Sequence, residues 1–359
     1  MSSNKNTFIA GITLVATLGG LLFGYDTAVI NGAVEALKDF FVLPLFDNPD
    51  LATDVIIQFK IAIAVSITIC LLLVSSFLYK LFGASKGMIY SIFVFAGVGA
   101  LLYFLLLSKP NVINETMANT IHGFNNASAL IGCVIGGSLG GYVSQTIGRK
   151  KGLLLAAILF TISAIGSAMP DTLNIFSLEI ITSFIFYRVI GGIGVGLASM
   201  LSPMYIAEIA PAKIRGKLVS WNQFAIIFGM LVVYFVNYFI AKGQPVEWIN
   251  DTGWRWMFAS ETIPAILFFT LLLFVPETPR FLVMANQEGD AMNVLQRSNG
   301  TDKAKEILEN IKASLKQKKA PWLSFGGMVI VIGIMLSVFQ QFVGINVVLY
   351  YASDIFRNM

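Results

Sequence analysis

The chain has 359 residues, of which 56% are hydrophobic and only 12% are charged, and its formal net charge at pH 7 is +4. A soluble domain carries about 25% charged residues on average, so this composition excludes a water-soluble globular protein and indicates an integral membrane protein. The basic residues are concentrated in a few short loops, which argues against a nucleic-acid-binding surface.

Nine apolar segments are long enough to cross a lipid bilayer as helices, since each crossing needs about 20 residues. They predict an all-α, polytopic membrane protein. In chain order the predicted spans are 8–41, 55–79, 88–107, 121–146, 153–169, 176–205, 219–241, 254–274 and 325–356.

The distribution of Lys and Arg over the loops predicts the orientation of the chain. Basic loops alternate with acidic ones, and the basic loops fall on the same side as the N-terminus. Because cytoplasmic loops carry the excess of Lys and Arg, we expect a multi-pass protein of the inner cell membrane with a cytoplasmic N-terminus. The basic residues on this side are Lys80, Lys86, Arg149, Lys150, Lys151, Lys213, Arg215 and Lys217.

One long polar segment, 277–321, lies between the eighth and ninth spans and is therefore expected in the cytoplasm. Segments 287–300 and 301–318 are predicted to be amphipathic helices, because apolar residues such as Ala304, Ile307 and Leu308 recur at helical spacing. We expect these helices to cap two membrane bundles, since so short a segment is not expected to bury a core of its own.

Three ionisable residues lie well inside the predicted spans: Asp26, Arg188 and Glu261. Charged groups inside a bilayer are costly and usually mark a functional site. From the helical rise, Asp26 is about 27 Å from the cytoplasmic end of its span, whereas Arg188 and Glu261 are about 18 Å and about 10 Å from the outer ends of theirs. All three fall at similar depth in a membrane about 40 Å thick, so we predict one arginine between two carboxylates.

Two interpretations of this cluster are open. A static ion pair would fix the register of the helices. An arginine shared between two acids would instead be released from one acid when that acid takes up a proton, which would make the cluster a proton switch. A static pair needs only one acid, so the second acid favours the switch. The proton would then be the coupling ion, and no other cofactor and no metal site is predicted.

Four segments carry a resemblance to a known family: 19–32, which contains Asp26, 187–217, the motif Pro276-Glu-Thr-Pro-Arg280, and 340–351, which begins Gln340-Gln-Phe-Val-Gly-Ile-Asn346. The chain resembles the sugar porters of the major facilitator superfamily, and among them the proton-coupled xylose porters of bacteria. The resemblance covers nearly everything except about 43–120. It implies a bundle of the major-facilitator type and proton-coupled uptake of xylose or a related aldose by alternating access.

The resemblance also implies roles for individual residues. Asp26 corresponds to the proton-coupling acid, with Arg188 and Glu261 as its associated charges. Carboxamides both donate and accept hydrogen bonds and so suit sugar hydroxyls, while aromatic rings cover the C–H face of a sugar. The matches to sugar ligands are Phe23, Gln223, Gln340, Gln341, Asn346 and Tyr350, and the matches to cytoplasmic gating ion pairs are Arg149, Glu208, Arg215, Glu277 and Arg280.

Three features depart from the family pattern. Gln145 and Thr146 stand where the family has Asp and Arg, which weakens one inner ion-pair latch, and Met230 stands where the xylose porters have a further Gln. Residues 47–120 form an insertion with two additional spans, which we expect outside the bundle against lipid. The chain also stops after the family's seventh helix, so we expect a truncated form.

These expectations divide the chain into five parts: a first transmembrane helix (1–46), the insertion (47–120), the remaining five helices of a six-helix N-terminal bundle (121–275), a cytoplasmic linker (276–321) and the first helix of an incomplete C-terminal bundle (322–359). We expect a monomer in the lipid bilayer that binds a small-molecule sugar. A non-transporting sugar sensor or inactive remnant, and a facilitative sugar uniporter, are the alternatives. An enzyme is not expected, because the sequence has no nucleophile–base pair, metal cluster or cofactor loop.

Overall fold

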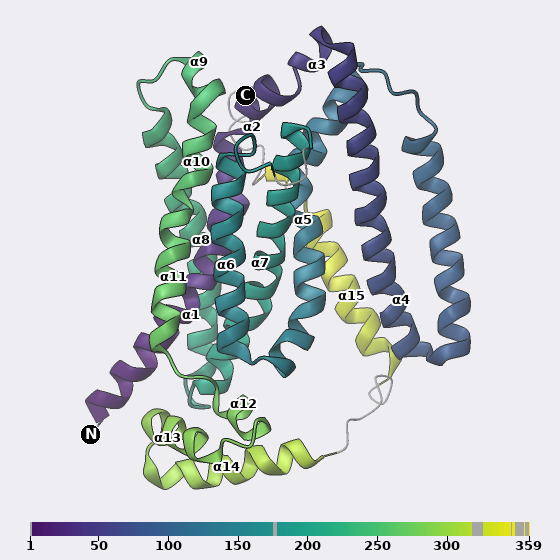
Figure 1. Ribbon diagram of the computed structural model, residues 1–359. Coiled ribbons are helices and arrows are strands. Elements are labelled where there is room, and N and C mark those ends of the chain that lie inside the picture. Colours follow the sequence, from purple (N-terminus) through teal and green to yellow (C-terminus); the bar gives the residue numbers. More distant parts are fainter. Residues whose placement is uncertain (1, 175–177, 318–325, 346, 349–354, 356–358) are drawn as a thin grey trace.

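The computed structural model describes residues 2–174, 178–317, 326–345, 347–348, 355 and 359. Every regular element in this part of the chain is helical, and the helices long enough to cross a membrane stand side by side above the helices of residues 279–316 (Figure 1). The longer helices are α1 (Ser2–Val29), α4 (Pro49–Leu102), α5 (Glu115–Thr146), α6 (Arg149–Ala168), α7 (Ile180–Ile209), α8 (Arg215–Ala241), α11 (Thr262–Phe274), α13 (Glu288–Asn299), α14 (Thr301–Lys316) and α15 (Gly327–Phe342). The shorter ones are α2 (Val34–Phe41), α3 (Pro44–Asp47), α9 (Val246–Trp248), α10 (Trp254–Ser260) and α12 (Pro279–Met284), together with the 3-10 helix η1 (Ile30–Gly32) and the π-helices η2 (Tyr103–Leu107) and η3 (Ile249–Gly253).

Within the described residues, seven helical segments are long and apolar enough to cross a membrane. One of them covers two predicted spans, because α4 changes direction at Gly83, and α15 is a shorter apolar helix inside the predicted ninth span. The prediction of an all-α, polytopic membrane protein is confirmed.

The sequence suggested one helix that continues toward Phe41, but in the structure the first span is interrupted. α1 ends at Val29, and the turn η1 leads into α2. The side-chain amide of Asn237 on α8 donates to the Val29 carbonyl oxygen at 3.0 Å, which satisfies a carbonyl at the end of the helix. A glycine is required at position 32, because a Cβ there would lie 2.5 Å from Asn237 Nδ2. This contact fixes α1 against α8.

α7 lies at the centre of the bundle and packs against α1, α5 and α6. Glycines let α5 and α7 approach closely: a Cβ on Gly132 would overlap the Val189 carbonyl oxygen, and a Cβ on Gly192 would overlap the Ala129 carbonyl oxygen. Small residues at helix crossings are the usual means of close packing in lipid. The close crossing holds Arg188, on α7, inside the bundle.

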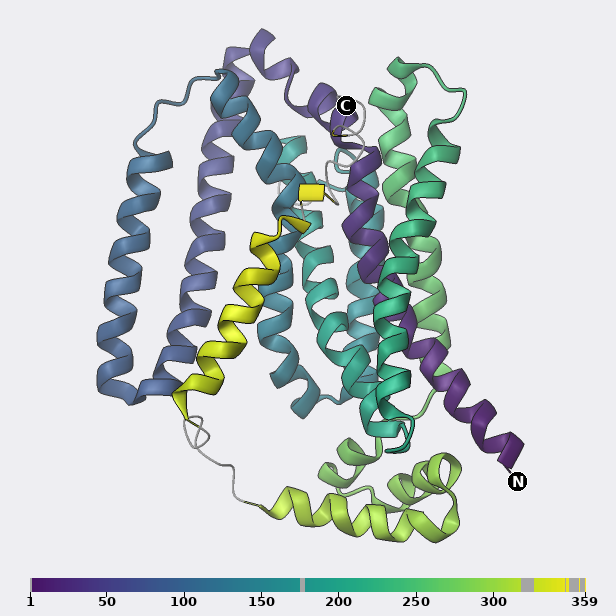
Figure 2. The same ribbon diagram turned by 180° about the vertical axis from the view of Figure 1, so that it is seen from behind.

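α4 forms a hairpin that stands beside the bundle, in the place predicted for the inserted spans (Figures 1 and 2). The two arms meet at Gly83, whose φ of 78° lies in the left-handed region that favours glycine. The first arm contacts the bundle where Phe59 and Phe124 meet edge to face at 5.2 Å. Most other side chains of the hairpin are exposed, and their contact with lipid stays a prediction.

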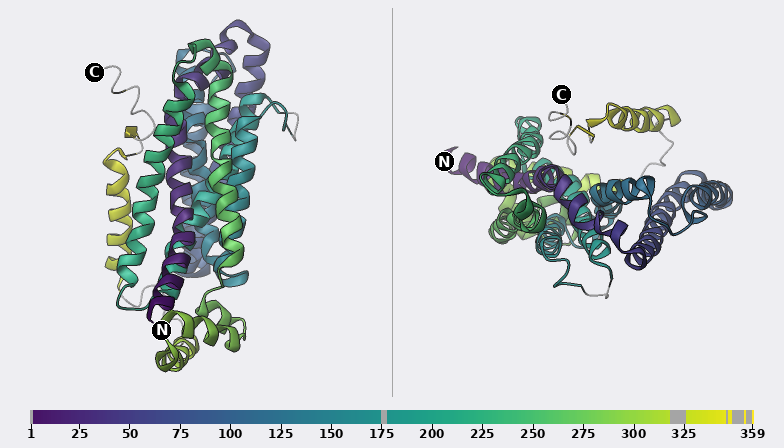
Figure 3. Two further views of the ribbon diagram at one scale, coloured as in Figure 1. Left: turned by 90° about the vertical axis from the view of Figure 1, so that its left-hand side faces the viewer. Right: turned by 90° about the horizontal axis from the view of Figure 1, so that it is seen from above.

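α12, α13 and α14 lie at the end of the bundle where α1 begins (Figure 3); we call this the linker end, and the opposite end the distal end. α13 and α14 coincide with the two predicted amphipathic helices. The expectation that this segment buries no core was wrong, because α12 adds a third apolar face. The enclosed residues are Leu282, Val283, Ala291, Val294, Leu295, Ala304 and Leu308.

Candidate functional site

The predicted pairing of Asp26 with Arg188 is present in the structure. Arg188 Nη1 on α7 lies 2.5 Å from Asp26 Oδ1 on α1, and both side chains are 2% exposed. Arg188 Nη2 also donates to the main-chain oxygen of Asp26 at 3.3 Å, and the guanidinium lies 5.3 Å from the centre of the Phe258 ring. A buried guanidinium with this many partners is held in one position.

Glu261 is the second acid of the predicted cluster, and the structure brings it to the same place. It is fully buried at the junction of α10 and α11 and interacts electrostatically with Asp26 and Arg188. The helix breaks there because Pro264 lacks the N–H that the Ser260 carbonyl would need. The carboxyl oxygens of Glu261 accept no hydrogen bond from Arg188, and the Asp26 carboxyl lies within hydrogen-bond reach of the Glu261 carboxyl. One arginine therefore lies near two acids, as the sequence predicts.

A cavity of about 170 Å³ opens on one side of the Asp26–Arg188 pair. Its polar lining comes from these two residues and from Thr27, Ser199 and Gln341. Small-molecule sites are usually about 300 Å³ or larger, so the cavity is small for a bound sugar. The remaining lining residues are Phe23, Ala129, Leu130, Cys133, Val195 and Gly196.

Two of the predicted sugar ligands, Phe23 and Gln341, line this cavity. Gln223 and Gln340 are exposed and lie outside its lining, so the structure does not bring them to the charged pair. Asn346 and Tyr350 lie outside the described residues. The roles of all six in sugar binding stay predictions.

Sequence reasoning missed the contributions of Thr27 and Ser199 to the cavity. Thr27 follows Asp26 directly in the chain. Ser199 follows Arg188 by eleven residues, which is about three helical turns, and Val195, also in the lining, follows by seven. This helical spacing places Ser199 on the same face of α7 as Arg188, so the sequence could have predicted its position near the pair.

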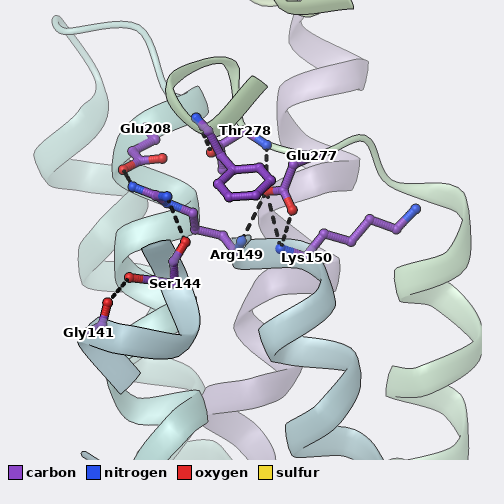
Figure 4. Close-up of polar contacts among 8 residues, drawn as sticks. Gly141, Ser144, Arg149, Lys150, Glu208, Glu277 and Thr278 are labelled. Atoms are coloured by element: carbon purple, nitrogen blue, oxygen red, sulfur yellow. Dashed lines mark hydrogen bonds and ion pairs between the residues drawn. The ribbon is translucent and has the colours of Figure 1, made fainter. Parts of the chain in front are cut away.

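Arg149 and Glu208 form an ion pair at the linker end of the bundle (Figure 4). Arg149 Nη2 lies 2.7 Å from Glu208 Oε1, and their side chains are 5% and 14% exposed. Arg149 Nη1 donates to the Ser144 carbonyl oxygen at 2.9 Å, and its guanidinium lies 5.7 Å from the centre of the Phe281 ring. This arginine therefore ties α5, α6, α7 and α12 together.

Glu277 contacts the start of α6 rather than a guanidinium. It accepts hydrogen bonds from the main-chain N–H groups of Arg149 at 3.2 Å, Lys150 at 3.0 Å and Thr278 at 2.8 Å (Figure 4). The residue before α6 is Gly148, which has no side chain to cap the helix, so Glu277 supplies the acceptor from a distant segment. Burial raises the pKa of Glu277, although these main-chain hydrogen bonds oppose the shift.

The other two predicted gate residues do not join this cluster. Arg215 is exposed and donates to the Ala210 carbonyl oxygen at 3.5 Å. Arg280 is exposed, and its side chain has no ion pair or hydrogen bond with any residue that the structure describes. The structure therefore brings Arg149, Glu208 and Glu277 together as one ion pair and one helix cap, and leaves Arg215 and Arg280 apart from them. The gating roles of all five residues stay predictions.

No group of three or more His, Cys, Asp or Glu side chains in the described part of the chain is arranged to hold a metal ion. The cavity offers one guanidinium, the Asp26 carboxyl and a few hydrogen-bonding groups, and the Glu261 carboxyl lies near the pair but outside the cavity lining. Such a set can hold and release a proton and can bind hydroxyl groups.

Comparison with known proteins defines the class. The family described as "Sugar (and other) transporter" matches residues 12–124 and 88–359, and the chain belongs to this family. It is 46% identical over 368 residues to the D-xylose-proton symporter of Escherichia coli strain K12, covering 99% of this chain and 62% of that protein. It is 34% identical over 362 residues to the arabinose-proton symporter of Bacillus subtilis strain 168, covering 99% of this chain and 60% of that protein.

Solved structures give the same result. The proton:xylose symporter XylE bound to 6-bromo-6-deoxy-D-glucose matches with a TM-score of 0.75 and 46% identity, over 99% of this chain and 64% of that one. A partially occluded, inward-open form of XylE from E. coli matches with a TM-score of 0.73 and 45% identity, over 98% of this chain and 68% of that one. The chain thus spans just under two thirds of the length of the curated relatives that it matches.

Proposed function

We propose that the protein is a proton-coupled sugar symporter that takes up xylose or a related aldose by alternating access. The observation that carries this proposal is the buried Asp26–Arg188 pair at the edge of a cavity, with Glu261 beside it. Similarity to xylose and arabinose symporters supports the substrate class. Gln341 and Phe23 would contact the sugar by hydrogen bonding and by stacking.

The charges of the cluster suggest how proton binding couples to movement. With both acids ionised, one arginine and two carboxylates carry a net charge of −1 inside the membrane, which is costly. One proton makes the cluster neutral. If that proton binds Asp26, it weakens the contact with Arg188 and lets α1 and α7 separate. Glu261 is then available as the second partner of the guanidinium.

We further propose that the linker end faces the cytoplasm and that the protein resides in the inner membrane as a monomer. The support for this orientation is the accumulation of Lys and Arg in the loops at that end. The Arg149–Glu208 pair and the Glu277 cap would close this end in one state of the cycle. Opening would require these contacts to break together.

The test is sugar uptake in proteoliposomes containing the full chain, with and without a pH gradient. The wild-type protein is expected to accumulate sugar against its gradient. Asp26→Asn is expected to lose accumulation but to keep exchange of labelled for unlabelled sugar, because exchange needs no net proton movement. Accumulation by Asp26→Asn at the wild-type rate would show that coupling does not pass through this acid.

A facilitative uniporter is the second candidate, and one similarity favours it. The glucose facilitated diffusion protein of Zymomonas mobilis is 34% identical to this chain over 362 residues. In a uniporter, the same pH gradient would leave the final sugar distribution unchanged. The buried acid at position 26 favours the symporter, because a uniporter moves no proton and needs no proton-binding group.

A further inference from the structure

Two serines on α6 lack the hydrogen bond that most helical hydroxyls make. Ser163 Oγ and Ser167 Oγ are buried without a partner among the described residues, and the two residues are 1% and 0% exposed. Other hydroxyls of the bundle donate to the preceding turn, as Thr161 does to the Ala157 carbonyl oxygen at 2.9 Å, although Ser202 Oγ on α7 also lacks a partner among the described residues. Buried polar atoms without a protein partner are uncommon and are typically satisfied by ordered water.

Ser163 lies beside the proton-binding pair. A Cβ added to Gly191 on α7 would overlap Ser163 Oγ and would lie 3.6 Å from Asp26 Oδ1. The two oxygens therefore lie no more than about 6 Å apart, with Ser163 filling the position that a side chain at 191 would take. One water molecule can bridge such a separation.

Ser163 is also at the level of Glu261. α6 runs antiparallel to α10 and α11, and two contacts fix the register: Arg255 Nη1 donates to the Ala168 carbonyl oxygen at 3.1 Å, and Lys150 Nζ donates to the Leu273 carbonyl oxygen at 3.0 Å. Interpolation between these contacts places Ser163 opposite the Ser260–Glu261 junction. The unpartnered hydroxyl of Ser163 and the buried carboxyl of Glu261 thus lie at the same depth.

The face of α6 that carries Ser163 leads toward the distal end. Ser167 lies one turn farther on, and the helix ends one residue later, at Ala168. Asp171 pairs with Arg255 at 2.9 Å, with side chains 46% and 21% exposed. Because Arg255 also donates to the Ala168 carbonyl oxygen, this partly exposed pair lies beside the distal end of α6.

The cavity lies on the other side of Asp26. Its lining comes from α1, α5 and α7 together with Gln341, and α6 contributes no residue to it. The space beside Ser163 is therefore not part of the cavity.

We propose that Ser163 and Ser167 hold a buried chain of water molecules through which protons pass between the distal surface, near Asp171, and the acids Asp26 and Glu261. Each transfer breaks one O–H bond and forms another, and the last proton is taken up by a carboxylate oxygen. Asp26, Arg188 and Glu261 face the inner end of this chain, and Asp171 and Arg255 face its outer end. The sugar and the proton then reach the charged cluster by separate routes. The inference rests on the proposed proton coupling.

The test follows protonation of the buried carboxyls by time-resolved infrared spectroscopy after a pH jump, using the reconstituted full chain. Asp26→Asn and Glu261→Gln assign the carbonyl band of the protonated acids. The side chains introduced by Ser167→Val and Ser167→Thr have nearly the same shape, but only that of Thr carries a hydroxyl. We expect Ser167→Val to slow protonation by at least about tenfold, and Ser167→Thr to restore it.

Two further variants complete the test. Ser163→Ala, which removes only a hydroxyl, is expected to slow protonation like Ser167→Val. Thr161→Val is the matched control on the same helix and is expected to protonate at the wild-type rate. Wild-type rates in Ser163→Ala and Ser167→Val would overturn the water route while leaving the proton site intact. The lack of any band that Asp26→Asn or Glu261→Gln removes would overturn the proton site, and the route with it.

Discussion

Asp26 Oδ1 on α1 and Arg188 Nη1 on α7 lie 2.5 Å apart inside the bundle, although 162 positions separate the two residues in the chain. Each charge compensates the burial of the other. Removing one partner leaves the other charge buried and uncompensated, whereas removing both leaves two neutral groups. The pair therefore makes α1 and α7 depend on each other for stability.

Arg188→Ala is expected to lower the free energy of unfolding by about 3–5 kcal/mol, because it leaves Asp26 without its guanidinium. The double variant Asp26→Asn with Arg188→Gln is expected to lose less unfolding free energy than Asp26→Asn alone and Arg188→Gln alone lose in sum. Unfolding of the detergent-solubilised protein, followed by tryptophan fluorescence, measures the cycle. Additive losses would mean that the two residues do not interact energetically.

Glu208→Gln is expected to open the linker end, because it removes the charge that pairs with Arg149. Cys133, which lines the cavity, reports on this opening in a Cys70→Ser background. Loss of about 1 kcal/mol should raise labelling of Cys133 by a thiol reagent added at the linker end about fivefold. Arg280→Gln, at an exposed residue outside the cluster, is the control and should leave labelling unchanged. Equal labelling of all three proteins would contradict a gating role for the pair.

The buried carboxyl of Glu277 is expected to make the unfolding free energy of the protein depend on pH. Burial raises the pKa of the Glu277 carboxyl above its ordinary value of 4.5, so the folded protein binds this proton more tightly than the unfolded chain does. The resulting stabilisation is full below that value and is lost as the pH rises through the higher folded pKa. The difference in unfolding free energy between wild type and Glu277→Gln should therefore fall across this range. A difference that rises with pH would show that the main-chain hydrogen bonds to Glu277 outweigh its burial.

Gly132 and Gly137 offer a matched pair on α5. A Cβ at Gly132 would overlap the backbone of α7, whereas a Cβ at Gly137 would meet nothing within 4 Å. Gly132→Ala is expected to destabilise the protein by about 1–3 kcal/mol through overpacking. Gly137→Ala is expected to stabilise it by about 0.5–1 kcal/mol. Thermal unfolding of both variants decides this, and equal effects would mean that the α5–α7 crossing is looser than described.

Hydropathy and charge placement predicted the spans, the two amphipathic helices and the common depth of Asp26, Arg188 and Glu261, because each depends on local patterns and on helical rise. Contacts between distant segments were not predictable in this way. The interruption after Val29 depends on Asn237 of α8. From the sequence, Glu277 was interpreted as a member of an ion pair, because residue types do not show which main-chain N–H groups lie near an acid.

The sugar ligands show a further limit. Gln223 and Gln341 both lie in predicted spans, yet only Gln341 reaches the cavity. The depth of a residue follows from its position along a helix. The direction of its side chain follows from the rotation of that helix within the bundle, which hydropathy does not determine when a span is apolar on all sides.

The most direct measurement is the pH dependence of D-xylose binding to the purified protein and to Asp26→Asn. If sugar and proton bind together through this acid, wild-type affinity should rise as the pH falls, by up to about tenfold per pH unit for one proton. Asp26→Asn should then bind xylose with an affinity that does not change with pH. A flat profile in the wild type, or an unchanged slope in Asp26→Asn, would contradict proton coupling at the Asp26–Arg188 pair.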